Sequence, residues 1–243
     1  MTDLDVRLSP AGLAPESLQG RTVAVIDVFR AGSTAVTALA NGARAVIPAA
    51  DHGEAGRLAA RLDADTVLVA GDRNGAPLDG YVGPSPAALS SETVRGRTVV
   101  LTTANGTPAL ARARGAETTV AASFLNASRA AAFVHLAARA GHPVTLLCAG
   151  TDGRVAVEDV LCAGFMLGRF LQPSDVARLG DAAQMAYALY AGSHRQIGAA
   201  LAGSTQARRL AAQGAGADVA ACTRIDAVDT LPVLSDGRLV ADG

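Results

Sequence analysis

The sequence predicts an α/β protein whose mainly parallel sheet is covered by helices on both faces, and three observations support this fold class. First, short apolar runs alternate with stretches of helical character. Second, only 3% of the 243 residues are aromatic and 50% are hydrophobic, so the core must be Ala, Val and Leu packed closely against Gly. Third, residues that start and stop helices stand between the runs. The six runs that predict strands are residues 21–28, 43–49, 65–71, 97–103, 117–123 and 143–150.

Helix boundaries follow these runs in order along the chain. Gly42 is typical of a helix C-cap, because glycine takes the left-handed backbone conformation found there. Asp51, three residues before a glutamate, resembles a capping box that opens the next helix. Ser85 and Thr107 are each followed by proline, which predicts a capping hydroxyl and a first helical turn at both positions.

Beyond residue 168 the pattern changes. Residues 174–213 predict consecutive helices with no strand between them, and residues 230–240 predict a hairpin that turns at Asp236-Gly237. The chain contains no internal repeat, linker or low-complexity tract. We therefore predict a single domain over residues 1–243, with residues 174–213 as a helical annex within it and a terminal hairpin. Because an Ala-rich annex can cover a partner subunit, a homodimer is a further expectation.

Charge and composition exclude several classes of partner. A net charge of -1, a pI near 6.4 and few aromatic side chains provide neither a basic surface for nucleic acid nor a stacking platform for bases. Residues 1–15 lack the regions of a signal peptide, and no apolar run reaches the roughly 18 residues of a membrane span. We therefore expect a cytoplasmic protein that binds neither nucleic acid nor membrane. The three cysteines have no CxxC spacing, which leaves reduced thiols as the expected state.

Polar side chains follow four of the predicted strands. They lie in residues 27–34, 71–75, 102–107 and 151–159, where acids, bases or amides stand beside glycine and hydroxyls. In open parallel sheets ligands bind at the carboxyl ends of the strands, so these loops are expected to converge. Arginine and backbone N–H groups can hold phosphate oxygens, and carboxylates can hold Mg²⁺. The four clusters therefore indicate a metal-dependent site for a phosphate ester.

Each cluster also has a purely structural explanation. Asp27 is suited to capping a helix, and Asp72-Arg73 to a surface ion pair of little stability value. Glu158 and Asp159 would favour the macrodipole of a helix that begins there. The coincidence of four such strand ends is what favours a functional site.

Two short signatures point to other phosphatase chemistries. Asp27 ends a strand as the nucleophile of haloacid-dehalogenase phosphatases does, but Phe29 occupies the position of their second aspartate. Cys148 to Arg154 has the C-x5-R spacing of the protein tyrosine phosphatase loop, in which a thiolate attacks phosphorus. A buried Cys148 that acts as a small hydrophobic residue is the competing interpretation, and the thiolate phosphatase stays an alternative.

Several longer segments resemble the 2-phosphosulfolactate phosphatase family in order and spacing. They are VIDVFRAGSTAVTALANGA, VAGDRNGAPLDGYVGPSP, LTTANGTPAL and CAGTDGRVAVEDVLCAG, and the tail DVAACTRIDAVDTLPVLSDGRL is similar as well. The resemblance covers nearly the whole chain. It implies a Mg²⁺-dependent hydrolase, in an α/β fold peculiar to the family, that converts 2-phospho-3-sulfolactate to 3-sulfolactate and phosphate. In archaea this step belongs to coenzyme M biosynthesis.

The resemblance, together with the strand-end clusters, also assigns roles to individual residues. Catalytic roles fall on Asp27, Arg30, Asp72, Arg73, Asn105 and Thr107. Substrate contacts fall on Ser33, Thr34, Ser85, Thr103, Gly106 and Thr151, with Arg154 as a further cation for the substrate. Ligands of Mg²⁺ fall on Asp27, Glu158 and Asp159. A role for Asp27 as base or nucleophile stays open alongside metal binding.

Two positions depart from the family pattern. Asp72 replaces a glutamate, which withdraws the carboxylate by about one methylene and would loosen a ligand or make its contact water-mediated. Pro84 stands where the family usually has asparagine, which removes an amide side chain and a backbone donor. These departures keep a second hypothesis open, a non-catalytic binder of a phosphorylated or sulfonated metabolite. The first expectation remains an enzyme acting on a small, multiply anionic phosphate ester.

Overall fold

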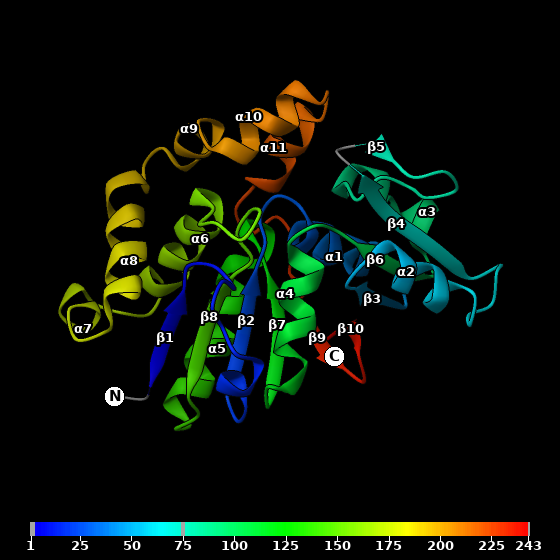
Figure 1. The fold of residues 1–243 in the computed structure, drawn as a ribbon. Coiled ribbons are helices and arrows are strands. Elements are labelled where there is room, and N and C mark those ends of the chain that lie inside the picture. The colour runs from blue at the N-terminus through cyan, green and yellow to red at the C-terminus, as the bar shows by residue number, and fades with distance from the viewer. Residues whose placement is uncertain (1–2, 74–75, 243) are drawn as a thin grey trace.

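One sheet of ten strands organises the part of the chain that the structure describes. The computed structural model describes residues 3–73 and 76–242, with the side chains of residues 73 and 76 outside that description. The strand order is β1-β8-β2-β7-β9-β10-β3-β6-β4-β5 (Figure 1). The strands are β1 (Leu4–Arg7), β2 (Thr22–Ile26), β3 (Ala45–Ala49), β4 (Val67–Arg73), β5 (Ala76–Pro77), β6 (Thr98–Thr102), β7 (Thr118–Ala122), β8 (Val144–Cys148), β9 (Pro232–Ser235) and β10 (Arg238–Ala241).

Two parallel blocks make up most of this sheet. β1, β8, β2 and β7 are parallel neighbours, and so are β3, β6 and β4. The β9–β10 hairpin lies between the blocks and pairs antiparallel with β7 on one side and with β3 on the other. The predicted α/β fold with a mainly parallel sheet is therefore confirmed.

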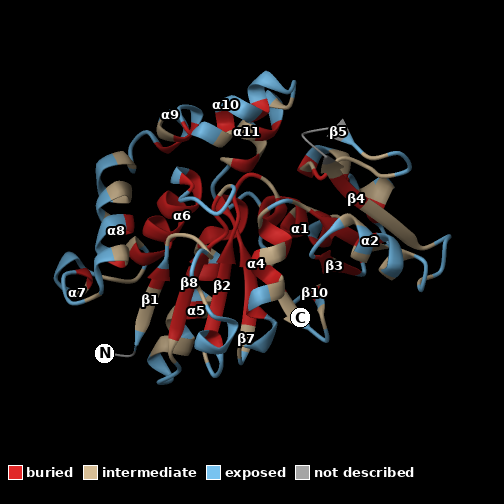
Figure 2. Ribbon diagram, viewed as in Figure 1, coloured by how far each residue is buried: buried red, intermediate tan, exposed pale blue. Residues whose placement is uncertain are grey.

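Helices cover both faces of the central strands. Ile26 of β2 belongs to one apolar cluster and its neighbour Val25 to another, because successive side chains of a strand point to opposite faces. Every residue of β2 and β8 is buried, which Figure 2 shows as red strands in the middle of the molecule. The first cluster includes α5 (Ala127–Arg139) and α6 (Val157–Gly168), and the second includes α1 (Ala31–Ala40) and α4 (Gly106–Arg112).

All six predicted strands form, as β2, β3, β4, β6, β7 and β8. The hairpin also turns where predicted, with φ of 49° at Asp236 and 78° at Gly237. It enters the middle of the sheet, however, and not an edge. β1 and β5 escape prediction because runs of four and two residues are too short to show a period.

The predicted helix starts have mixed outcomes. Asp51 caps α2 (His52–Ala59) as expected, because its carboxylate accepts a hydrogen bond from the Glu54 N–H at 2.7 Å. Ser85 caps a three-residue 3-10 helix, Pro86–Ala88, instead of an α-helix. The cap at Thr107 is wrong, since α4 begins one residue earlier, at Gly106. The short α3 (Ser91–Val94) follows the 3-10 helix.

The annex, defined as α7 to α11, curves from β1 to the carboxyl ends of the central strands (Figure 1). Its helices are α7 (Pro173–Val176), α8 (Asp181–Ser193), α9 (Ile197–Ala202), α10 (Thr205–Ala212) and α11 (Gly216–Cys222). The helical prediction for residues 174–213 is confirmed, and α11 extends it. A Cβ on Gly164 of α6 would stand 2.0 Å from the Ala186 carbonyl oxygen, so α8 lies directly on the α6 backbone. None of the described helices combines the length and the apolar character that crossing a membrane requires.

Candidate active site

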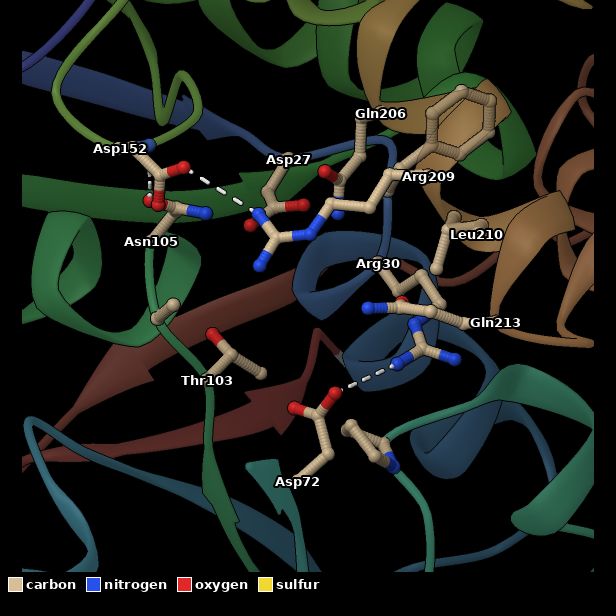
Figure 3. Close-up of a pocket in the computed structure, with 13 residues that line it drawn as sticks. Asp27, Arg30, Asp72, Thr103, Asn105, Asp152, Gln206, Arg209, Leu210 and Gln213 are labelled. Atoms are coloured by element: carbon tan, nitrogen blue, oxygen red, sulfur yellow. Dashed lines mark hydrogen bonds and ion pairs between the residues drawn. The ribbon is translucent and has the colours of Figure 1, made fainter. Parts of the chain in front are cut away.

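A cavity of about 200 Å³ opens where the strand-end loops meet helix α10 (Figure 3). Asp27 follows β2, Asp72 lies near the end of β4, Thr103 follows β6 and Asp152 follows β8, so both parallel blocks contribute. The loops therefore converge, as expected for the carboxyl ends of parallel strands. The cavity brings together five residues of the sequence-derived site: Asp27, Arg30, Asp72, Thr103 and Asn105.

Asp27 is a buried carboxylate at the inner wall of the cavity. Its side chain accepts a hydrogen bond from the Ala31 N–H at 3.2 Å, at the start of α1, and the residue is only 5% exposed. Burial raises the pKa of Asp27 to about 7, and the nearby Glu158 carboxylate acts in the same direction, against weaker opposing effects of the Ala31 N–H and Arg30. Asp27 can therefore gain or lose a proton near neutral pH.

The close approach of α4 to Asp27 requires glycine at position 106. A Cβ added there would stand 2.1 Å from Asp27 Oδ2 and 2.5 Å from the Ala31 Cβ. Gly106 thus shapes the site without lining the cavity.

We expect Gly106→Ala to displace Asp27, because overpacking forces neighbouring atoms to move. The predicted result is a loss of about 1–3 kcal/mol of unfolding free energy and a fall in catalytic rate of roughly tenfold or more. Urea denaturation and phosphate release would measure the two effects. Gly115→Ala is the matched control, because no atom lies within 4 Å of a Cβ at that position. Unchanged activity of Gly106→Ala would contradict the expectation.

Glu158 and Asp159 lie in the first turn of α6, as predicted, but play different parts. Asp159 accepts hydrogen bonds from the Val28 and Gly150 N–H groups, both at 2.9 Å, so its two oxygens hold the loops after β2 and β8. Burial, and then the charges of Asp27 and Glu158, raise the pKa of Asp159 well above its usual range. Asp159 therefore positions the site, and it does not line the cavity.

Glu158 is 1% exposed, and its Oε1 has no hydrogen-bond partner among the described residues. Burial raises the pKa of Glu158, while a hydrogen bond to Ser204 of the annex lowers it. A buried carboxylate oxygen without a donor, beside a second buried carboxylate, is an arrangement that a bound cation would relieve.

The described residues contain no group of three or more His, Cys, Asp or Glu side chains placed to hold a metal ion. Of the three predicted ligands, Asp159 is occupied by backbone donors, which leaves Asp27 and Glu158. Mg²⁺ commonly takes one or two protein carboxylates and completes its shell with water and substrate phosphate. The two remaining carboxylates match that number of ligands; Asp27 lines the cavity, and the buried Glu158 does not.

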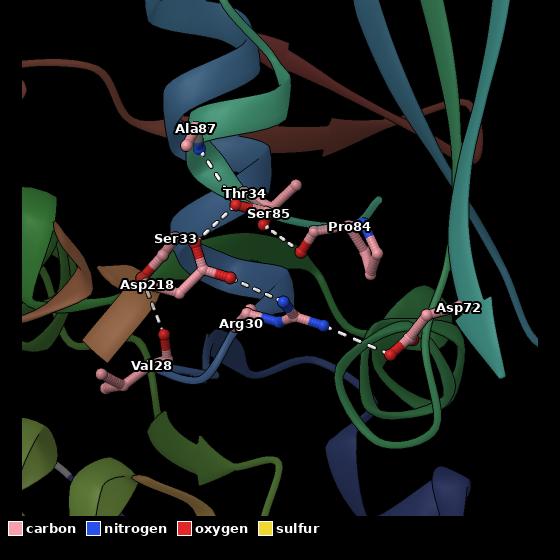
Figure 4. A network of polar contacts seen from close by, with 9 residues as sticks. All are labelled: Val28, Arg30, Ser33, Thr34, Asp72, Pro84, Ser85, Ala87 and Asp218. Carbon is pink, nitrogen blue, oxygen red and sulfur yellow. Dashed lines mark hydrogen bonds and ion pairs between the residues drawn. The ribbon is translucent and has the colours of Figure 1, made fainter. Parts of the chain in front are cut away.

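Arg30 is held between two carboxylates at the cavity wall (Figure 4). Its guanidinium donates to Asp218 of α11 at 2.6 Å and to Asp72 of β4 at 3.2 Å, and its side chain is 10% exposed. The Ser85 hydroxyl donates to the other oxygen of Asp218 at 2.5 Å. Arg30 thus ties β4, the start of α1 and the annex together, and its charge is already compensated.

Other predicted substrate contacts turn away from the cavity. The Ser33 hydroxyl donates to the Val28 carbonyl and the Thr34 hydroxyl to the Pro84 carbonyl, both at 2.9 Å, and both residues are fully buried. Thr107 is also fully buried and exchanges hydrogen bonds with Thr103. These hydroxyls fix the loops, and Ser33, Thr34, Ser85, Gly106, Thr107 and Thr151 do not line the cavity.

Two arginines that were predicted to bind substrate, Arg73 and Arg154, are not among the described side chains that line the cavity. The Arg73 side chain lies outside the described part of the structure. Arg154 is exposed and does not line the cavity; its backbone pairs with Thr151.

The annex supplies lining residues that the sequence did not predict. Gln206 and Arg209 of α10 face the cavity, and so does Gln213, which follows the helix directly. Asp152 faces the cavity from the loop after β8. The spacing of three and four residues between Gln206, Arg209 and Gln213 places them on one helix face. That spacing was the only signal in the sequence, and it is equally typical of a solvated helix face.

Cys148 is fully buried in β8, opposite Ile26 of β2, and does not line the cavity. Burial raises the pKa of its thiol well above the usual range, which disfavours the thiolate that a nucleophile would need. Cys162 and Cys222 are buried as well, and all three cysteines are free thiols.

We expect Cys148→Ala to keep its turnover within about threefold of the parent, because the thiol acts as a small apolar side chain. Its unfolding free energy should fall by about 1 kcal/mol through the lost sulfur contacts. Initial rates of phosphate release at matched protein concentration would measure this. A loss of activity with an unchanged circular dichroism spectrum would restore the thiolate mechanism.

Comparisons with known proteins agree on one family. The family model described as 2-phosphosulpholactate phosphatase matches residues 8–237. A probable 2-phosphosulfolactate phosphatase of Thermotoga petrophila is 38% identical over 238 residues, which cover 98% of this chain and 97% of the relative. The corresponding protein of Thermotoga maritima is 37% identical with the same coverage, and that of Caldanaerobacter subterraneus is 33% identical over 90% of both chains.

Proposed function

Since the chain belongs to the 2-phosphosulfolactate phosphatase family, we propose that it hydrolyses 2-phospho-3-sulfolactate to 3-sulfolactate and phosphate. The single observation that best supports this chemistry is Asp27, a buried carboxylate with a pKa of about 7 on the wall of a cavity of about 200 Å³. The reaction adds water to phosphorus, breaks the ester P–O bond and returns a proton to the departing alkoxide. A group that exchanges protons near neutral pH suits this task.

We propose that Asp27 and Glu158 hold Mg²⁺. When bound, the cation would neutralise phosphoryl oxygens and lower the pKa of water. The raised pKa values of both carboxylates mean that they retain protons more readily in the metal-free protein. Metal binding should therefore release protons, because ligands bind deprotonated.

The loop between β6 and α4 provides donors for the phosphoryl oxygens. The Asn105 side-chain oxygen accepts the Asp152 N–H at 2.9 Å, which leaves the amide NH₂ turned toward the cavity (Figure 3). Thr103 accepts the Thr107 N–H through its hydroxyl oxygen at 3.2 Å, so the hydroxyl proton is available to the substrate. Both donors are held in place before substrate arrives, which favours catalysis.

We expect phosphate release from 2-phospho-3-sulfolactate to require Mg²⁺ and to fall by at least about 100-fold in EDTA, because the substrate charge would otherwise face two buried carboxylates. A malachite green assay with and without Mg²⁺ measures the rate. Titrating Mg²⁺ into weakly buffered protein should also release protons, independently of turnover. Metal-independent hydrolysis would contradict the proposed mechanism.

A non-catalytic binder is the second candidate, and the two departures from the family pattern favour it. Pro84 lines the cavity where the family pattern has an amide, and the carboxylate of Asp72 is committed to Arg30. Tight calorimetric binding of the substrate without phosphate release under any divalent metal would decide for the binder. The cytoplasmic location and the homodimer stay predictions.

A further inference from the structure

The cavity has few cations for the charge it must accept. This inference rests on the proposed function, in which the substrate carries a carboxylate and a sulfonate besides its phosphate. Among the described side chains that line the cavity, Arg30 and Arg209 are the arginines. Arg30 already donates to two carboxylates and is 10% exposed, so it has little capacity for a further anion.

Arg209 of α10 is in the opposite situation. Its ion pair is with Asp152, at 3.4 Å, and the two side chains are 44% and 65% exposed. Such an exposed and solvent-screened pair contributes little free energy, so an incoming acid group can replace it at low cost. The guanidinium is therefore positioned at the cavity and available.

Asp152 links Arg209 to the neighbouring loop. Its N–H donates to the Asn105 side chain at 2.9 Å, and its carboxylate holds Arg209 from the other side of the cavity (Figure 3). The loop after β8 is thus hydrogen-bonded to the loop that carries Asn105, and Arg209 lies beside both.

Helix α10 is itself anchored to the reacting groups. Ser204 caps α10 and is hydrogen-bonded to Glu158, while Leu210 is buried against the core. Gln206, one turn before Arg209, brings a buried amide oxygen without a partner among the described residues to the same cavity. The helix face is polar, one of its amide oxygens has no described partner, and Ser204 ties the helix to Glu158, as expected of a surface that receives a ligand.

We propose that Arg209 is a specificity-determining residue that binds an acid group of the substrate remote from the scissile phosphate. An arginine fork matches the oxygens of a carboxylate or a sulfonate equally well, so the acid group is the shared chemistry. Binding exchanges the Asp152 contact for a contact with the substrate. Arg209 then contributes to substrate selection and not to the chemical step.

The test crosses enzyme variants with substrate analogues. Arg209→Gln is compared with Arg208→Gln, a neighbour whose contacts are with Gly203 and Thr205 and which does not line the cavity. The substrates are 2-phospho-3-sulfolactate, 2-phospholactate, which lacks the sulfonate, and 2-(phosphonooxy)ethanesulfonate, which lacks the carboxylate. Arg209→Gln should lower kcat/KM for the full substrate by about 10- to 100-fold, mainly through KM, and Arg208→Gln should not.

The analogue lacking the group that Arg209 binds should be hydrolysed equally well by Arg209→Gln and the parent. A similar loss on all three substrates, or no loss on any, would overturn the inference. Calorimetric binding of 3-sulfolactate, which carries both acid groups and no phosphate, should also weaken about tenfold or more in Arg209→Gln. If the parent releases no phosphate yet binds 3-sulfolactate through Arg209, the proposed function fails and this inference stands.

Discussion

Replacing Asp27 by asparagine is expected to lower phosphate release about 10³-fold and, without metal, to make the protein more stable at neutral pH. Asparagine has nearly the same shape, and its oxygen can still accept the Ala31 N–H. It removes the carboxylate that would hold metal or exchange a proton. It also removes a charge that the buried site disfavours.

The sign of the stability effect follows from the raised pKa. The pKa of Asp27 is about 7 in the folded protein and 3.8 without the fold, so the folded state binds the proton more tightly. The stability that this proton contributes is complete below pH 3.8 and is lost as the pH rises through 7. The asparagine side chain does not titrate, so at a pH of about 7.5 the variant should gain on the order of 2–4 kcal/mol over the parent.

Thermal unfolding of both proteins in EDTA, from about pH 4 to about pH 8, measures this difference. The two curves should converge at low pH and separate at high pH, and Mg²⁺ should stabilise the parent alone. Asp229→Asn, at a side chain that is 87% exposed, serves as the control without a pH-dependent gain. An inactive variant that is less stable at every pH would mean that Asp27 serves the fold and not the reaction.

Arg30→Gln is expected to be strongly destabilising, with a loss of about 3 kcal/mol in unfolding free energy. The substitution leaves Asp218, which is 5% exposed, without its ionic partner. Removing one member of a buried pair strands the other charge, which costs more than the pair itself contributed. Activity should fall as well, because Arg30 joins two walls of the cavity.

Urea denaturation measures this loss, and a second substitution separates its causes. The double variant Arg30→Gln/Asp218→Asn should recover part of the stability, because it no longer contains the stranded charge. Arg7→Gln breaks the exposed pair with Asp5, at 2.7 Å, and should cost less than about 1 kcal/mol. Equal losses for Arg30→Gln and Arg7→Gln would show that burial of the network is unimportant.

The strands were predictable because a fully buried parallel strand must be a continuous apolar run. Residues 22–26 and 144–148 follow that pattern. Each strand contains one threonine, at the first position of the first strand and at the second position of the other. The place of the β9–β10 hairpin in the middle of the sheet was not predictable, since a local pattern indicates a hairpin but not its neighbours. The division of the parallel strands into two blocks was not predictable either, because the sequence does not show which strands pair.

The site residues that directly follow strands were predictable. Whether a side chain points into the cavity or away from it was not predictable. Asp27 and Thr103 follow strands, and strand ends converge in this architecture. Ser33 and Thr34 lie in the same cluster, but the turn into α1 directs their hydroxyls to backbone carbonyls. Arg209 escaped prediction because a polar stripe on a short helix does not reveal whether it faces water or a neighbouring loop.

The central position of the β9–β10 hairpin bears on how the protein is made. Until residues 232–241 have left the ribosome, β7 and β3 each present an unpaired inner edge. In a chain that lacks the hairpin, those two edges would be open to mispairing with other chains. The hairpin follows both parallel blocks in the chain, so the sheet can become continuous only after residues 232–241 have been synthesised.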